Sequence, residues 1–496
     1  MPGPLSRVAF AFVLAGALAP LAACTVNPAT GQQSFTGFMS ESEELRVGAQ
    51  EHPKILREFG GAYDNPALAD YVRRVGESLV RVSETPNLRY TFTVLNDDKV
   101  NAFALPGGYV YITRGLLALA ENEAEMAGVL AHEIGHVVAR HTAQRYSQAM
   151  AANIGLTVLG VLGQAAGVPG AASDLAQFGA AAALQSYSRE QELESDMLAV
   201  RYMVRTGYAP GAMNSFFRKM EANDRLLAEL EGRPGGDDRY NIMSTHPRTS
   251  QRIDQAIALA QVNSAPGLRY ERKAFLDRID GMTFGDDPRQ GIRRGREFVH
   301  PELRFRFTVP QGFALFNSPR QVIARGPQQS LIVFDMESEA KARAAGPLDR
   351  YLTHEWGARF ALRDVEPITV NGLSGATGRT RVQTRNGVMD LRLVAMRADA
   401  ARIYRMVFVT PPRLTDSLRT ELQRTTYSFR LLTPAEAAGV KPLRIALVTA
   451  KAGDTAESLA ARMPFPDHRL EWFETLNGLA RGQPLVPGET FKTVVE

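Results

Sequence analysis

Residues 130–141 read LAHEIGHVVARH, a stretch that predicts both a helix and a metal site. On an α-helix each residue advances by about 100°, so His132 and His136 lie roughly 40° apart and one turn from each other. Both imidazoles can therefore reach one ion, as the pattern H-E-x-x-H requires. His141 lies roughly 180° from His132 on the same helix, so we interpret it as a surface or packing residue.

Glu133 follows the first histidine and flanks the same face of the predicted helix. Zinc lowers the pKa of a bound water toward about 7, and a neighbouring carboxylate can pass the proton to a leaving amine. The motif therefore predicts hydrolysis, with Glu133 as the general base. Gly135 places no side chain between the histidines, which permits a neighbouring backbone to approach closely. The alternative is a buried histidine pair in a core helix.

A catalytic zinc needs a third protein ligand, and the acidic stretch YSREQELESDMLAV at residues 187–200 offers candidates. Glu192 and Asp196 are four residues apart and share one helical face. Glu192 could bind the ion, and Asp196 could accept the N–H of a ligand histidine and fix its tautomer. On spacing alone Glu190 and Glu194 compete for the ligand role, and such a helix can also be a solvated face.

The first 24 residues predict a secretory signal that ends in a lipidation site. Arg7 precedes a short apolar stretch, and small residues lead to Cys24, the only cysteine. The ending L-A-A-C resembles the lipobox of bacterial lipoproteins, and Thr25 resembles their outer-membrane sorting signal in Gram-negative bacteria. We expect acylated Cys24 to anchor the chain in outer-membrane lipid, on the periplasmic face. The alternative is an incidental cysteine beside an ordinary cleavage site.

The composition is that of a globular protein with several domains. Of 496 residues, 45% are hydrophobic and 22% charged, as in folded proteins of this size. The net charge is only +4, and no basic runs with interleaved aromatics are present, so nucleic acid is not an expected partner. Polar residues and a proline interrupt the apolar residues 151–184, which we expect to form a buried helical hairpin. Contact with membrane or substrate is the alternative.

Hydrophobic periodicity predicts an α+β multidomain protein. Asn65-Pro66 begins a helix, and strands at 90–95, 101–105 and 109–113 precede the motif helix, expected over 122–141. We predict a signal peptide (1–24), a tether (25–39), a mainly helical domain with a small sheet that carries the metal motif (40–275), a linker (276–300), an α+β domain of unknown role (301–433), a second linker (434–442) and a small C-terminal unit (443–496).

These motifs resemble the HtpX and CAAX-prenyl-protease type of zinc metallopeptidase, a gluzincin family. Its members carry H-E-x-x-H on one helix and, on a later one, S-R-x-x-E-x-E-x-D, which residues 188–196 match as SREQELESD. The resemblance implies one zinc ion per chain, bound by His132, His136 and Glu192. It places Asp196 directly behind these ligands.

The resemblance covers roughly residues 25–300 and is nearest to periplasmic or lipoprotein members of the family. It matches His246, in STHPRTSQRI, to a histidine near the zinc that could stabilise an oxyanion or transiently occupy the open coordination position. It matches Arg252 to an arginine that donates to developing negative charge. A strand beside the cleft, which could pair with an extended substrate, corresponds to Asn101, Ala102, Phe103 and Ala104.

Residues 443–496 resemble a LysM module, a βααβ unit that binds N-acetylglucosamine polymers such as peptidoglycan. The stretches KAGDTAESLAARM and LNGL carry this likeness, and a generic small α+β unit is the alternative. Together, motifs and resemblance predict a zinc-dependent endopeptidase of the cell envelope that hydrolyses unfolded or misassembled envelope proteins. The alternative is a non-catalytic chaperone, or a peptidoglycan-binding scaffold with a latent protease domain.

Overall fold

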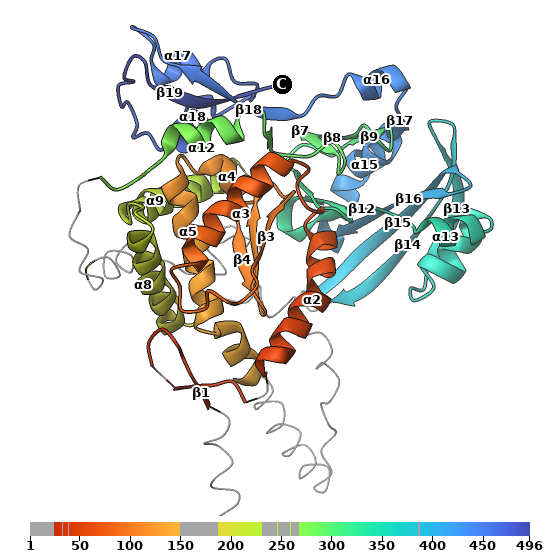
Figure 1. Ribbon diagram of the computed structural model, residues 1–496. Helices are drawn as coiled ribbons and strands as arrows, with labels where there is room; N and C mark the ends of the chain where they lie inside the picture. Colours follow the sequence, from red (N-terminus) through yellow and green to blue (C-terminus); the bar gives the residue numbers. More distant parts are fainter. Residues whose placement is uncertain are drawn as a thin grey trace, which may run out of the picture. The chain divides into compact units, whose positions relative to one another are not determined.

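The computed structural model describes residues 24–31, 33–37, 39–148, 187–230, 246, 258, 267–384 and 387–496. The chain is mixed α/β and forms two compact units (Figure 1). The first unit combines Met1–Arg57, Gly61–Met282 and Arg444–Val495, and the second combines Glu58–Gly60, Thr283–Leu443 and Glu496. No helix in the described part of the chain has the length and apolar character needed to cross a membrane.

The first unit begins with an antiparallel hairpin and two helices. Asn65 begins the second helix as predicted, because its side chain accepts the backbone N–H of Leu68 and Pro66 occupies the first turn. A three-stranded sheet follows, with the order β3-β5-β4, so β4 is an edge strand. The elements are β1 (Cys24–Val26), β2 (Gln33–Phe35), α2 (Glu41–Glu58), α3 (Pro66–Val80), β3 (Thr91–Leu95), β4 (Ala102–Leu105) and β5 (Tyr109–Thr113).

The motif helix α5 (Glu123–Val138) lies in the centre of this unit and is buried along nearly its whole length. It is apolar on most sides, as expected of a helix surrounded by other elements. Asn122 begins it by accepting the N–H of Glu125. Ser188 and Gln191 form a capping box at the start of the acidic helix α8. The helices that pack against α5 are α3, α8 (Arg189–Arg205), α9 (Gly211–Leu230) and α12 (Arg272–Ile279), and the short helix α4 (Arg114–Leu119) precedes it in the chain.

Three predicted boundaries differ from the structure. The motif helix ends at Val138, and Arg140 adopts a left-handed conformation with φ 56°. Residues 276–300 are not a simple linker, since they contain the end of α12, β6 (Thr283–Phe284), β7 (Ile292–Arg294) and β8 (Glu297–His300), and α16 (Pro434–Ala438) lies in the second predicted linker. Such short elements leave almost no periodicity to detect. The hairpin predicted at 151–184 lies outside the described residues.

The C-terminal residues have the predicted βααβ order and form part of the first unit. The two strands pair antiparallel, and the backbone of Ile445 exchanges hydrogen bonds with Gly281 and Met282. The elements are β18 (Leu443–Thr449), α17 (Ala456–Ala460), α18 (Arg469–Leu476) and β19 (Thr490–Val495).

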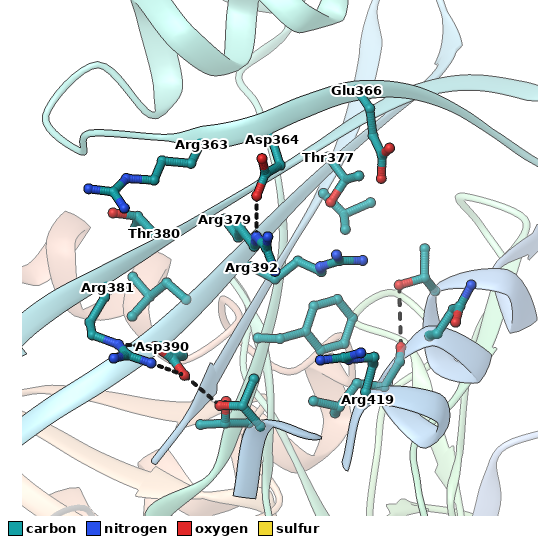
Figure 2. A pocket seen from close by; sticks show the side chains of 18 of the residues that line it. Arg363, Asp364, Glu366, Thr377, Arg379, Thr380, Arg381, Asp390, Arg392 and Arg419 are labelled. Carbon is teal, nitrogen blue, oxygen red and sulfur yellow. Dashed lines mark hydrogen bonds and ion pairs between the residues drawn. The ribbon is translucent and has the colours of Figure 1, made fainter. Parts of the chain in front are cut away.

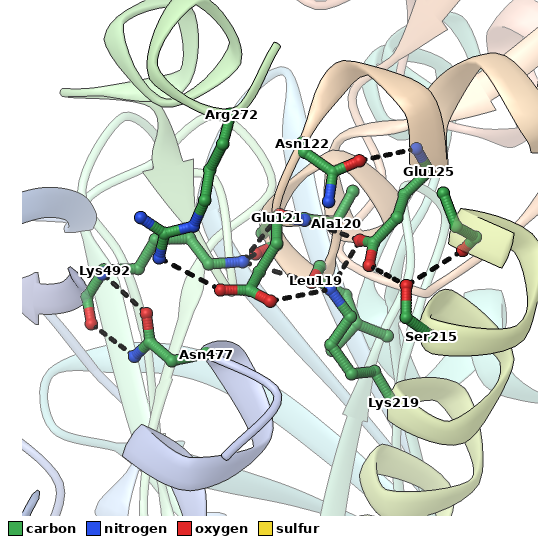
Figure 3. A network of polar contacts seen from close by, with 12 residues as sticks. Leu119, Ala120, Glu121, Asn122, Glu125, Ser215, Lys219, Arg272, Asn477 and Lys492 are labelled. Carbon is green, nitrogen blue, oxygen red and sulfur yellow. Dashed lines mark hydrogen bonds and ion pairs between the residues drawn. The ribbon is translucent and has the colours of Figure 1, made fainter. Parts of the chain in front are cut away.

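Lys492 of β19 fixes the βααβ unit to the end of α4 (Figure 3). Its side chain is fully buried, and Nζ lies 2.8, 3.1 and 2.6 Å from the carbonyl oxygens of Ala118, Leu119 and Ala120. Asn477 binds the backbone N–H and carbonyl of Lys492 at 2.7 and 2.8 Å. Nζ of Lys492 thus donates to three carbonyl oxygens at the end of α4. Carbonyls at the end of a helix have no intrahelical partners.

A second set of ion pairs lies beside this lysine (Figure 3). Arg272 donates to Glu121 at 3.1 Å and to the carbonyl of Thr490 at 2.7 Å. Lys219 of α9 binds Glu125 of α5, with both side chains buried. Because these contacts connect β19, α9, α12 and the start of α5, the C-terminal residues complete the first unit.

The second unit contains a seven-stranded antiparallel sheet, with the order β10-β11-β12-β16-β15-β14-β13. Helices cover both faces of this sheet, with α15 on one face and α13, α14 and the π-helix η4 on the other (Figure 1). A second sheet, β17-β9-β8-β7, shares the α15 core. The elements are β9 (Phe305–Thr308), β10 (Ala314–Asn317), β11 (Val322–Arg325), η3 (Pro327–Gln329), β12 (Leu331–Met336), α13 (Glu339–Ala344), α14 (Leu348–Arg350), η4 (Tyr351–Trp356), β13 (Arg363–Val370), β14 (Leu373–Thr384), β15 (Gly387–Asp399), β16 (Arg402–Thr410), α15 (Pro412–Ser428) and β17 (Arg430–Leu431).

Replacing Lys492 tests the role of the C-terminal residues in the first unit. Lys492→Ala leaves three buried carbonyls without their donor, so we expect the free energy of unfolding to fall by about 1–3 kcal/mol. Urea unfolding followed by circular dichroism measures the change, with the exposed Lys451→Ala as control. Equal midpoints for the two variants would show that the lysine contributes little to the docking.

Candidate metal centre

Four buried side chains converge between α5 and α8: His132, His136, Glu192 and His246. One donor atom of each lies within 4.8 Å of the others. The Nε2 atoms of His132 and His136 are 3.0 Å apart, and the carboxylate oxygens of Glu192 lie 3.6 and 3.4 Å from them. Nδ1 of His246 lies 2.7 Å from Glu192 and 3.3 Å from Nε2 of His132. These four residues could hold a metal ion.

Gly135 allows the two helices to approach this closely. A Cβ atom at this position would lie 2.7 Å from Oγ and 3.1 Å from the carbonyl oxygen of Ser195. Both distances are too short for any larger residue. Oγ of Ser195 also donates to the carbonyl of His132 at 2.5 Å. The glycine therefore permits the close backbone approach that the sequence predicts, and this approach brings Glu192 to the histidines.

Each motif histidine has a partner on the nitrogen that faces away from the cluster. Nδ1 of His132 lies 2.8 Å from Oδ1 of Asp196. Nδ1 of His136 lies 2.8 Å from Nδ1 of His141. Such contacts fix the tautomer and leave each Nε2 lone pair available to a cation.

His141 lies outside the donor cluster and is a packing residue, one of the two interpretations that the sequence left open, but the expectation that it faces away from the motif histidines was wrong. The helical projection fails because α5 ends at Val138 and the left-handed Arg140 turns the chain. The guanidinium of Arg140 holds this turn by donating to Glu44 at 2.6 Å and to the carbonyl of Met39 at 2.8 Å. His141 is consequently fully buried against His136.

The electrostatics of the cluster suit a divalent cation. Burial lowers the pKa of His136 well below its usual value, against the opposing effect of Glu192. Burial alone would raise the pKa of Glu192, but the neighbouring histidines, His246 first, outweigh it and hold that pKa well below its usual range. The imidazole is thus neutral and the carboxylate charged, as metal ligands must be. Two imidazoles and a carboxylate are the donor set of catalytic zinc sites.

Glu133 lies beside the donor cluster without belonging to it. Its side chain is fully buried, and Oε1 is 3.5 Å from Nε2 of His246. This distance is longer than a hydrogen bond. The carboxylate of Glu133 is nevertheless only 3.5 Å from His246, so it could contact a small molecule bound at the cluster.

Tyr187 is a site residue that sequence reasoning missed. Its ring stacks on His136 with centroids 3.8 Å apart and lies 5.3 Å from the ring of His246. Arg145 lies over the ring at 3.7 Å. Tyr187 precedes the capping box of α8, and no periodic pattern indicated that its ring would point at the motif helix.

The residues of the predicted substrate strand lie outside the donor cluster, on and beside β4. Asn101, Ala102, Phe103 and Ala104 are buried along edge strand β4 or directly before it. The side-chain amide of Asn101 has no hydrogen-bond partner among the residues that the structure describes. Arg252 lies outside the described residues.

A groove of about 840 Å³ in the second unit is a different kind of site (Figure 2). Arginines and carboxylates line it, and several are paired, such as Arg379 with Asp364 and Arg381 with Asp390. No histidine lines the groove. Within the described ranges, the cluster at α5 and α8 is the one group of three or more converging His, Cys, Asp or Glu donors.

Comparison with known proteins agrees with this geometry. Residues 66–260 match the model of peptidase family M48. The chain is 32% identical over 259 residues to the beta-barrel assembly-enhancing protease of Yersinia pestis. This alignment covers 50% of this chain and 51% of the relative. It is 29% identical over 234 residues to the mitochondrial metalloendopeptidase OMA1 of Schizosaccharomyces pombe, covering 46% and 63%.

The chain spans about half the length of the curated relatives it matches first. Among solved structures, PsbP of Synechocystis matches with 11% identity and a TM-score of 0.21, over 28% of this chain and 98% of PsbP.

Gly135→Ala tests whether helix contact controls the metal centre. The added methyl group has no room against Ser195, so we expect a loss of about 1–3 kcal/mol in the free energy of unfolding and weaker zinc binding. Gly211→Ala, a glycine with nothing within 4 Å of the added Cβ, is the matched control. Urea unfolding and a zinc competition assay measure both effects, and an unchanged Gly135→Ala protein would contradict the close-packing argument.

Proposed function

Proceeding from the peptidase family M48 match at residues 66–260, we propose that this protein is a zinc-dependent endopeptidase of the bacterial cell envelope. The observation that carries the proposal is the buried cluster His132, His136 and Glu192 with Glu133 beside it. A site that only needed a structural ion has no use for a carboxylate in this position. The names of the relatives, a beta-barrel assembly-enhancing protease and a metalloendopeptidase, support hydrolysis of envelope proteins.

The residues have separate roles in this proposal. His132, His136 and Glu192 hold the zinc ion, and Asp196 orients His132. Zinc, when bound, polarises a peptide carbonyl and makes water more acidic. Glu133 takes the proton from the attacking water and returns it to the leaving amine nitrogen.

In this proposal His246 closes the site as a fourth donor, which its place in the donor cluster supports. Four protein donors leave no open position for a substrate, whereas catalytic zinc sites use three. Of the two roles predicted for His246, occupation of the fourth position is favoured by its 2.7 Å distance to Glu192. The same geometry supports a second candidate function, a chaperone or scaffold whose protease domain stays latent. Arg252 remains, by resemblance, the proposed donor to the oxyanion.

Substrates would add to the edge strand β4 as extended segments. The buried side-chain amide of Asn101 supports this, because no described residue hydrogen-bonds to it and a substrate backbone could satisfy it. Main-chain pairing selects for extended conformation more than for particular side chains. We therefore propose unfolded or misassembled envelope proteins as the substrate class.

The two ends of the chain supply the proposed location. Acylation of Cys24 would anchor the protein to outer-membrane lipid on the periplasmic side of a Gram-negative envelope. Residues 443–496 would bind peptidoglycan if their likeness to a LysM module reflects function. The βααβ order of these residues is consistent with that likeness.

Glu133→Gln tests the catalytic role. The amide keeps the volume of the side chain but cannot accept the proton, so casein hydrolysis should fall by about a hundredfold or more while zinc content stays at one ion per chain. The exposed Glu190→Gln on α8 should retain full activity. Undiminished hydrolysis by zinc-loaded Glu133→Gln protein would exclude the proposed mechanism.

His246→Ala tests the closed state. Removing the fourth donor opens a coordination position, so we expect faster casein cleavage by the zinc-loaded protein. The exposed His354→Ala serves as control. Slower cleavage at full zinc content would instead assign His246 to oxyanion stabilisation.

A further inference from the structure

A line of polar side chains runs from the N-terminal hairpin to the metal centre. Oε1 of Glu194 accepts hydrogen bonds from Nδ2 of Asn27 at 2.7 Å and from Oγ1 of Thr30 at 2.8 Å. Oε2 of Glu194 lies 3.1 Å from Nε2 of His141. Nδ1 of His141 lies 2.8 Å from Nδ1 of His136. Five residues from three separate segments thus form one continuous chain of contacts.

With a neutral His141 ring, the hydrogen bonds allow one consistent placement of protons. The charged carboxylate of Glu194 only accepts, so Nε2 of His141 carries the proton between them. In a neutral His141 ring, Nδ1 is then the acceptor and receives the N–H of His136 Nδ1. This leaves the Nε2 lone pair of His136 directed at the donor cluster. Glu194 therefore sets the tautomer of His136 through one intervening ring, as Asp196 does directly for His132.

The loop that holds Glu194 is itself ordered by short contacts. Asn27 is 4% exposed, and its Oδ1 accepts the backbone N–H of Ala29 at 2.9 Å. This contact orients the amide so that Nδ2 points to Glu194. Strands β1 and β2 pair on either side of the loop, with Cys24 opposite Phe35.

We propose that Asn27, Thr30, Glu194 and His141 are positioning residues of the metal centre, so that the segment directly after Cys24 fixes His136. This goes beyond the proposed function, in which the N-terminal segment serves only as an anchor. Asn27 lies three positions after Cys24 (27 − 24). If Cys24 is acylated as proposed, a restraint on it would reach the metal ligand His136 through this short loop.

The competing explanation is that these contacts only pack the hairpin against α8. Packing would change the stability of the fold without a specific effect on zinc. If Asn27 instead acts on His136 through Glu194 and His141, replacing Asn27 should weaken zinc binding only in a protein that still contains Glu194. A double-mutant cycle separates the two explanations.

The experiment measures the zinc affinity of the full-length chain by competition with a chelating dye. We expect Glu194→Ala to weaken zinc binding by about tenfold or more, and Asn27→Ala by about threefold. The double variant should bind zinc no more weakly than Glu194→Ala alone. Glu190→Gln, an exposed change on the same helix, should bind as the unmodified chain does.

Unchanged zinc affinity in Glu194→Ala, or an equal loss from Asn27→Ala in both backgrounds, would overturn the proposal. Melting of the zinc-free proteins verifies that each variant folds. Glu194→Gln, which keeps the side-chain volume, replaces Glu194→Ala in the cycle if the alanine variant does not fold. Because the measurement is binding and not cleavage, its result is independent of whether the protein is a peptidase.

Discussion

The contact between Gly135 on α5 and Ser195 on α8 is the constraint on which the metal centre depends. The histidines belong to one helix and the carboxylates to another, so the donor set exists only if the two backbones lie within a side chain's length. A Cβ at Gly135 would come within 2.7 Å of Ser195. The hydrogen bond from Ser195 to the carbonyl of His132 fixes the register of the helices at the same point. Small residues at the contact therefore position large ligands on either side of it.

Burying so many polar groups in one place is unfavourable for the fold alone. Glu192 is a buried carboxylate, and taking such a charge out of water costs several kcal/mol. The protein reduces this cost by giving each motif histidine an outer partner, Asp196 for His132 and His141 for His136. A divalent cation at the inner nitrogens would add a positive charge beside Glu192. The buried donors and their outer partners are thus arranged as a metal site requires.

Much of this could be predicted from the sequence because it depends on local patterns. The helix starts near Asn65 and Asn122 and the strand–turn–strand before α4 follow from neighbouring residues, and the structure confirms them. His141 could not be placed, because the helical projection assumes that the helix continues, and Arg140 ends it through contacts with α2. The contacts of Lys492 with α4, more than 370 positions away, are equally invisible to local patterns.

Residues near both ends of the chain secure the helix that carries the histidines. At the beginning of α5, Lys492 binds the carbonyls at the end of α4, and Lys219 binds Glu125. Beyond its end, His141 connects His136 to Glu194, which the N-terminal loop holds in turn. A helix restrained at both ends keeps its histidines aligned with α8, and neither restraint comes from the motif itself. The H-E-x-x-H pattern specifies which atoms can bind the ion, whereas residues remote in sequence determine how rigidly those atoms are held.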